Sequence, residues 1–236
     1  LQEECSVIIL INKKGEIIIF DTILDLIYPQ VCGVCGKINK KSLCNRCNTK
    51  LKKEYLFTIN NYNNDLSKNF TEHCYFFKYE NLIREQIIAL KFREKPYIYK
   101  SISYFLKNNK KSFEYLEKYD IIIVVPISKG RKRERGYNQS LLMIREISQI
   151  INAKIIMNVL YKMKNTVPQS SLNKKQREEN AKGVYKVINC NNIKNKKILL
   201  VDDIYTTGST INECANALIQ NGINKEQIGA LTIAKD

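Results

Sequence analysis

Two adjacent carboxylates stand beside a small, hydroxyl-rich turn in the stretch Ile198–Thr210, which reads ILLVDDIYTTGST. The apolar run before them is typical of a central parallel strand covered on both faces. In open α/β sheets, ligands bind beyond the carboxyl ends of such strands, where we expect Asp202 and Asp203. A helix is predicted from about Ser209, so backbone N–H groups with positive partial charge would face a ligand there.

The turn and the two acids favour different parts of one ligand. A phosphate monoester fits the turn, and because carboxylates repel phosphate, the acids must face sugar hydroxyls or Mg²⁺. The sequence therefore predicts a phosphorylated sugar. Its phosphate would be bound by five residues: Thr206, Thr207, Gly208, Ser209 and Thr210. An ordinary strand followed by an N-capped helix is the alternative, but it does not account for two acids in succession before TTGST.

A second buried strand, DIIIVVP, is followed by a strongly basic loop. The strand ends at Pro126, and Gly130 is expected to give the loop its flexibility. Five cationic residues stand against a single Glu: Lys129, Arg131, Lys132, Arg133 and Arg135. This loop suits a highly anionic ligand. A solvated surface loop and a nucleic-acid patch are the alternatives, and charge alone does not separate them.

Four of the eight cysteines form two CxxC pairs separated by eight residues: Cys32, Cys35, Cys44 and Cys47. Two such knuckles complete a tetrahedral shell of four thiolates, the donor set of many structural Zn²⁺ sites. No His or carboxylate lies between the pairs, so we expect a closed, structural site. An iron–sulfur or redox CxxC site is the alternative. The single histidine, His73, is expected to be a core or surface residue.

The 13-residue stretch from Ile198 resembles the signature by which type I phosphoribosyltransferases bind 5-phosphoribosyl 1-pyrophosphate (PRPP). This resemblance implies that Asp202 and Asp203 bind the ribose 2- and 3-hydroxyls as the catalytic pair, and that the turn binds the 5-phosphate. It also implies that PRPP arrives with Mg²⁺. The pyrophosphate loop of that family would correspond to four residues here: Ser128, Lys129, Gly130 and Arg131.

Three further segments resemble the ComF-type branch of phosphoribosyltransferase-like proteins. They are RERGYNQS at 133–140, ALKFRE at 89–94 and the polar stretch 166–187. The resemblance implies a zinc-ribbon head and a mobile hood over the sugar at 166–183, for which an unstructured surface loop is the alternative. Basic or hood contacts to the ligand would come from five residues: Arg133, Arg135, Asn138, Gln169 and Arg177.

These sites require an α/β fold of the type I phosphoribosyltransferase kind. Strands alternate with helices from residue 120 onward, which predicts a mostly parallel central sheet with helices on both faces. We expect an N-terminal hairpin and zinc module over residues 1–60 and the phosphoribosyltransferase-like domain over 61–236. The hairpin, at 6–20, lies outside the ComF pattern.

Composition limits the function classes. The formal net charge is +16, which predicts affinity for phosphate unless the lysine-rich surface is only a compositional habit. No apolar run approaches the length of a membrane span, so we expect a cytoplasmic protein.

The ComF resemblance implies a protein of DNA uptake and natural transformation that binds PRPP or a nucleotide. Single-stranded DNA, a helicase and a DNA-processing protein are its implied partners. The alternative is an active phosphoribosyltransferase of nucleotide salvage or metabolism, in which a nucleophile displaces pyrophosphate from PRPP.

Overall fold

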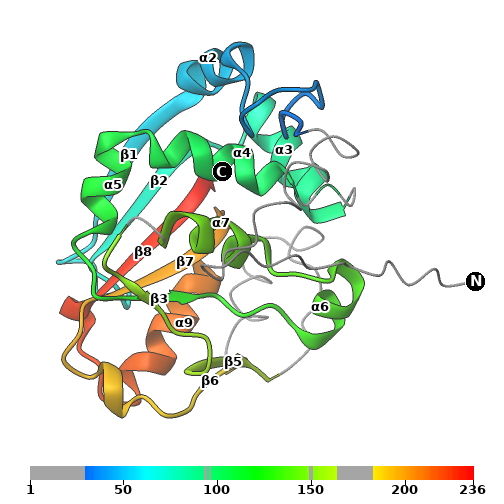
Figure 1. Ribbon diagram of the computed structural model, residues 1–236. Coiled ribbons are helices and arrows are strands. Elements are labelled where there is room, and N and C mark those ends of the chain that lie inside the picture. The colour runs from blue at the N-terminus through cyan, green and yellow to red at the C-terminus, as the bar shows by residue number, and fades with distance from the viewer. Residues whose placement is uncertain (1–29, 93–94, 96, 149–150, 164–182) are drawn as a thin grey trace, which may run out of the picture.

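A single six-stranded sheet organises the part of the chain that the computed structural model describes, which comprises residues 30–92, 95, 97–148, 151–163 and 183–236 (Figure 1). The strand order is β1-β2-β8-β7-β3-β4, and every neighbouring pair is parallel except the edge pair β1–β2. In that order the strands span Tyr55–Asn61, Glu72–Lys78, Ile228–Lys235, Ile198–Tyr205, Ile121–Val124 and Lys154–Ile155. The predicted mostly parallel sheet is confirmed.

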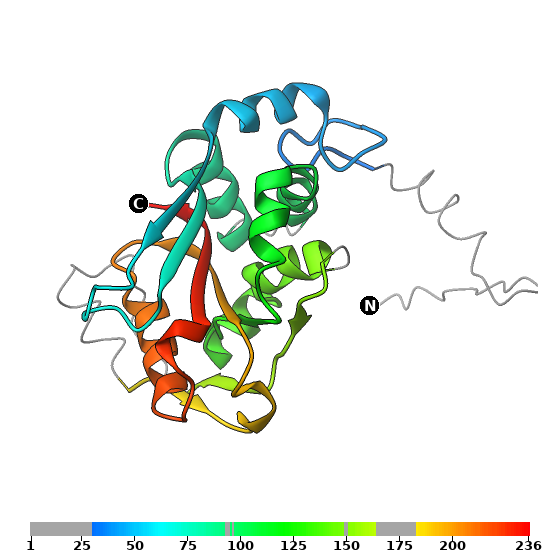
Figure 2. The same cartoon turned by 90° about the vertical axis from the view of Figure 1, so that its left-hand side faces the viewer.

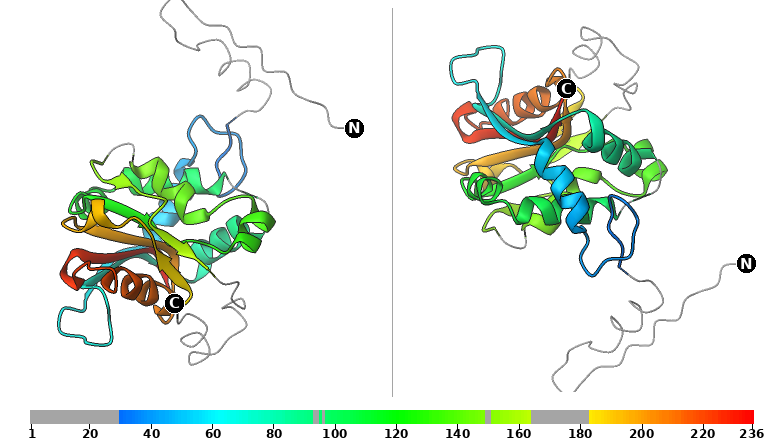
Figure 3. Two further views of the ribbon diagram at one scale, coloured as in Figure 1. Left: turned by 90° about the horizontal axis from the view of Figure 1, so that it is seen from below. Right: turned by 90° about the horizontal axis from the view of Figure 1, so that it is seen from above.

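Helices cover both faces of this sheet, as predicted (Figure 3). One face packs against α3 (Asn81–Phe92), α4 (Ile98–Lys107), α5 (Lys110–Leu116) and α7 (Gln139–Ser148). The other face packs against α9 (Ser209–Ile219) and a two-stranded ribbon of β5 (Leu160–Lys162) and β6 (Tyr185–Val187). The remaining elements are α2 (Asn45–Glu54), α6 (Lys129–Arg135), η2 (Asn191–Ile193) and η3 (Lys225–Gln227).

Strand β7 lies inside the sheet and alternates between its two faces. Leu199 and Val201 join the core under α3, α4 and α7, whereas Ile198 and Leu200 join the core under α9. Side chains of a strand point alternately to opposite faces. The strand continues through Tyr205, because its pairing with β8 extends that far, so the two acids lie within the strand and not after it.

The cysteine module packs directly on the main domain. Cys32 and Leu51 are fully buried in the same core as α3 and α4, and the Gly33 N–H donates to Ser101 Oγ of α4 at 2.9 Å. Figure 2 shows α2 at one end of the molecule, running directly into β1. The division at residue 60 stays a prediction, and β1 (residues 55–61), the edge strand of the sheet, crosses it.

The sequence predicts a helix over 97–109, and the structure places α4 there. A second helix, α5, follows it, because the Asn109 side chain accepts the Ser112 N–H and starts a new helix. The Asn-rich stretch 60–69, which the sequence marks as a boundary, lies largely in the connection between β1 and β2.

Some predictions fall outside the described residues. They are the hairpin at 6–20 and the hood segment apart from its last residue, Gly183, with Gln169 and Arg177. Within the described ranges, no helix combines the length and apolar character needed to cross a membrane.

Candidate functional site

The turn between β7 and α9 (residues 206–208) offers open backbone donors at the carboxyl end of the sheet. The amide N–H groups of Thr206, Thr207 and Gly208 have no hydrogen-bond partner within the described part of the chain. The next amide, of Ser209, donates to Thr207 Oγ1 at 3.3 Å, and the two hydroxyls are bonded to each other. Three successive open amides at the start of an 11-residue helix can bind a phosphate group.

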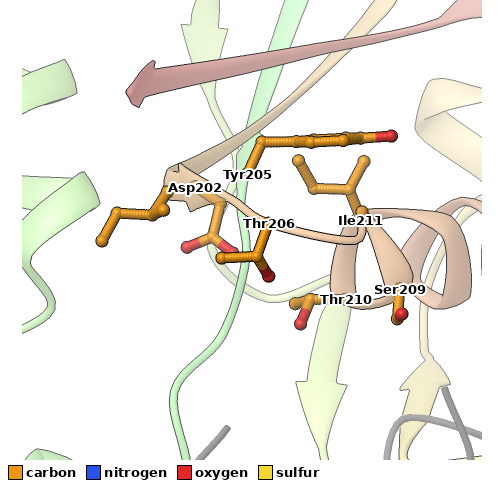
Figure 4. Close-up of a pocket in the computed structure, with 8 residues that line it drawn as sticks. Asp202, Tyr205, Thr206, Ser209, Thr210 and Ile211 are labelled. Atoms are coloured by element: carbon orange, nitrogen blue, oxygen red, sulfur yellow. The ribbon is translucent and has the colours of Figure 1, made fainter. Parts of the chain in front are cut away.

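Side-chain oxygens gather on one side of this turn. Figure 4 shows those of Asp202, Thr206 and Thr210 on the same side, with the Tyr205 ring on the other. Asp202, Thr206 and Thr210 also line a small hollow beside the turn. The arrangement places hydroxyl and carboxylate groups next to the open amides, as a sugar phosphate requires.

The turn rests on a buried aromatic stack. Gly208 has a φ of 77°, and a Cβ there would collide with the Tyr205 hydroxyl, so only glycine fits. The Tyr205 ring stacks on His73 at 4.0 Å, and His73 Nε2 is bonded to Thr232 Oγ1 at 2.8 Å. Burial lowers the pKa of His73 to about 3, so the ring stays neutral. His73 is therefore a core residue, one of the two places expected for it.

Asp202 belongs to the α9 side of the sheet and lines the hollow. One of its oxygens accepts the Asp203 N–H at 2.9 Å. Burial, and secondarily the charge of Asp203, raise the pKa of Asp202 to about 7, against the opposing effects of Lys91 and Lys162. Near neutral pH this carboxyl group therefore exists in both protonation states.

Asp203 points to the opposite face and is already paired. Its Oδ2 lies 2.8 Å from Lys91 Nζ of α3, and the two side chains are only 13% and 17% exposed. The sequence predicted that both acids face one sugar. In the structure the acids diverge, because successive residues of a strand point to opposite sides.

The connection after β3 is a short helix and not the predicted loop. Ser128 caps it by accepting the Arg131 N–H at 3.3 Å, and Lys129, Gly130 and Arg131 form its first turn. The expectation that Gly130 supplies turn flexibility is wrong, since the positive φ of 75° belongs to Gly136 at the end of the helix. A serine cap followed by Lys and Arg, which are good helix formers, explains the difference.

The side chains of the RGYNQ element (residues 135–139) make contacts within the protein. Asn138 donates to the Val125 carbonyl at 3.0 Å and accepts the Ser140 N–H at 3.1 Å, so it caps α7 and ties it to the end of β3. The Arg135 guanidinium lies 4.9 Å from the centre of the Phe92 ring. Both residues were predicted to contact ligand. The structure gives their side chains these internal contacts, while Arg133 is exposed to solvent.

The four cysteines converge as their spacing predicts. All four Sγ atoms of Cys32, Cys35, Cys44 and Cys47 lie within 4.8 Å of one another. The Cys47 backbone N–H is the main cause that lowers the pKa of Cys44 to about 7, which favours the thiolate form that a metal needs. The donor set fits a structural zinc ion.

Comparison with known proteins agrees with this geometry. Residues 138–236 match the family model described as phosphoribosyl transferase domain. The chain is 33% identical to Competence protein F of Haemophilus influenzae over 116 residues, which are 49% of this chain and 51% of that protein. It is 24% identical to Competence protein ComFC of Bacillus subtilis over 205 residues, 84% of this chain and 75% of that protein. These matches support a phosphoribosyl transferase domain over residues 138–236 and a similarity to ComF-type proteins.

A further relative is DNA utilization protein YhgH of Escherichia coli K12, 30% identical over 112 residues, 48% of each protein. The chain spans about half the length of the first relatives that it matches. The phosphoribosyl transferase match begins at residue 138, so the cysteine module and α6 precede it.

Two cations near the acids had no predicted role. Lys91 belongs to the ALKFRE element, whose resemblance to the ComF-type branch implied no role for the lysine. Lys162 of β5 is partly buried and interacts with Asp202 and Arg131, and burial, more than Arg131, lowers its pKa. No local pattern marks either lysine, because each reaches the acids only through the packing of its helix or strand.

Proposed function

We propose that this chain binds PRPP, or the phosphate of a nucleotide, at the β7–α9 turn. The observation that carries the proposal is the set of three open amides beside the Asp202 carboxyl group, at the carboxyl edge of a parallel sheet. The 5-phosphate would bind the amides of Thr206, Thr207 and Gly208. A sugar hydroxyl would donate to Asp202.

Magnesium ion fits this site by donor chemistry. Mg²⁺ in proteins is usually held by one or two carboxylates together with substrate phosphates and waters. Asp202 offers a carboxylate at the hollow, and PRPP would supply the phosphate oxygens. The ion would neutralise the charge of the pyrophosphate group.

The basic residues of the cysteine module support a role in handling DNA. Seven cationic side chains are exposed there: Lys37, Lys40, Lys41, Arg46, Lys50, Lys52 and Lys53. Glu54, at the end of α2, is turned away and accepts the N–H groups of Leu82 and Ile83. Relatives named for competence and DNA utilization point to the same role. We propose single-stranded DNA, a helicase and a DNA-processing protein as partners of this surface.

Thermal unfolding with Mg²⁺ and PRPP tests the site. Ligand that binds only the folded state stabilises it by RT ln(1 + L/Kd), where L is the free ligand concentration, and so raises the melting temperature. We expect a rise for the wild type, its loss in Asp202→Asn, and its retention in Glu117→Gln, which removes an exposed carboxylate at the end of α5. Absence of any rise at millimolar PRPP would refute the proposed site.

Binding of single-stranded DNA tests the second part. A fluorescent oligonucleotide should bind at low salt, with affinity falling steeply as salt increases, because lysines displace counterions from phosphates. Replacing Lys50, Lys52 and Lys53 by Gln should weaken this binding and leave the PRPP response intact. DNA affinity that is unchanged by the triple replacement would assign the contact to another surface.

One observation favours a catalytic function as a second candidate. The pKa of Asp202 is raised to about 7, which suits a group that exchanges a proton near neutral pH. An active phosphoribosyltransferase would release pyrophosphate from Mg²⁺-PRPP when supplied with a nucleobase. Release above the rate of an Asp202→Asn variant, measured across a panel of bases, would support transfer; equal rates would leave binding alone.

A further inference from the structure

The ion pair between Lys91 and Asp203 joins two elements that are remote in the chain. Lys91 lies in the last turn of α3, and Asp203 lies near the end of β7. Their 2.8 Å contact is largely shielded from water. The electrostatic attraction within such a pair is stronger than within an exposed pair, because solvent screens it less.

The lysine is held in position by its neighbours. The Tyr137 hydroxyl donates to the Leu90 carbonyl at 2.8 Å, and the Arg135 guanidinium packs over the Phe92 ring. The residues on both sides of Lys91 are therefore tied to the junction of α6 and α7. The three sequence elements ALKF, RGYNQ and VDD meet at this point, so the position of the ammonium group is built into the fold.

A fixed cation matters because the site brings negative charges together. Asp202 and Asp203 are adjacent, and a sugar polyphosphate would add several negative charges beside them. Within the described residues, three further cations interact with the acids or with one another: Arg131, Arg135 and Lys162. Of Lys91 and these three cations in the described part of the chain, Lys91 is the one that lies within ion-pair distance of either acid.

We propose that Lys91 is a built-in cation of the sugar site, which holds the Asp203 side chain in place and offsets the negative charge of the acidic pair when ligand binds, as a divalent ion also would. This inference rests on the proposed binding of PRPP. It makes Lys91 a positioning residue. The alternative is that Lys91 only occupies the place of a ligand. It would then have to leave Asp203 before the sugar could bind, and so would compete with the sugar.

Calorimetric titration of PRPP, with millimolar Mg²⁺ or with EDTA, separates these roles. The variants are Lys91→Met, which keeps the length of the side chain without its charge, and Lys91→Arg, which keeps the charge. Lys111→Met, on an exposed site of α5, controls for net charge. Melting temperatures without ligand establish that each variant is folded.

The expected result is a coupling between Lys91 and Mg²⁺. Loss of affinity in Lys91→Met should be about tenfold larger in EDTA than in Mg²⁺, as expected for two cations that offset the charge of the same acidic pair. Lys91→Arg should restore most of the affinity in EDTA, and Lys111→Met should match the wild type in both conditions.

Two results would overturn the inference while sparing the proposed function. Equal losses in EDTA and Mg²⁺ would show that the lysine and the ion act independently. Tighter binding by Lys91→Met in both conditions would show that the lysine competes with the sugar. If the wild type bound no PRPP even with Mg²⁺, the proposed function would fail and this inference with it.

Discussion

Two segments of this molecule are alike in sequence, because each has a buried strand followed by a polar stretch that contains glycine. In the structure they differ in whether their backbone amides stay open. After β7, a turn with Gly208 at a φ of 77° leaves three amides open. After β3, the Ser128 hydroxyl caps a helix, and the RGYNQ residues that follow bond inward. The comparison teaches that a strand followed by a glycine-containing polar segment is not sufficient for a phosphate loop. The left-handed glycine, supported by the Tyr205 ring, makes the difference.

The sharpest test makes the same substitution in both regions. Gly208→Ala places a Cβ against Tyr205 at a positive φ and should cost about 2–4 kcal/mol of unfolding free energy and abolish the PRPP response. Gly130→Ala, in the first turn of α6, should be neutral or stabilise by up to about 1 kcal/mol. Urea unfolding and thermal shifts measure both. Equal effects of the two substitutions would contradict the comparison.

The next largest predicted effect is the pH dependence of stability that arises from Asp202. The pKa of Asp202 is raised to about 7 in the folded protein from an ordinary value of 3.8, so between these pH values the native state holds more proton than the unfolded state. Stability should therefore fall as pH rises from about 4 to 7, by about 2–4 kcal/mol from this group.

A pH series of urea unfolding curves checks this acidity prediction. Asp202→Asn should remove most of the decline, because the amide does not titrate. Glu134→Gln, an exposed acid in α6, should leave the decline unchanged. A slope that survives in Asp202→Asn would assign the titration to another group.

Removal of the cap in the second region should have a smaller effect. Ser128→Ala leaves the Arg131 N–H without its side-chain acceptor and should cost about 1 kcal/mol, measured by urea unfolding. PRPP affinity should stay close to that of the wild type, because α6 contributes side-chain charge and not a cradle of amides. A loss as large as that of Gly208→Ala would mean that this helix holds ligand through its backbone.

The smallest predicted effect concerns one charge of α6. Arg131→Gln should weaken PRPP binding by about 0.5–1 kcal/mol at low salt, with the difference shrinking as salt is added, since Arg131 acts on the site only through screened electrostatic interactions. Calorimetric titration at two salt concentrations measures this. A salt-independent loss would indicate a direct contact with the ligand.

Much of the candidate site followed from the sequence because its signals are local. The VDD–TTGS run predicts its turn, since each feature depends on neighbouring residues. The CxxC pairs predict their cluster for the same reason, and all four Sγ atoms do converge. The mostly parallel sheet followed from alternating strands and helices, and the structure confirms it.

The sequence predictions were wrong where one local pattern is compatible with two different structures. The segment after β3 was equally compatible with a loop and with a capped helix, and the hydrogen bond to Ser128 Oγ is part of the helix that formed. Likewise Asn138 was as suitable for a ligand as for a helix cap. Its neighbours in space, the Val125 carbonyl and the Ser140 N–H, give it the second role.

The amino-acid sequence by itself determined that this chain has a glycine-containing turn after a buried strand, two neighbouring acids and a cluster of four cysteines. Only the tertiary structure decided that the acids diverge, and that Asp203 meets Lys91 while Asp202 meets the hollow. The physical reason is that pairing with β8 extends β7 through both acids, and the helices packed on each face then supply the partners. Strand alternation is a local property, but the identity of the covering helix is not.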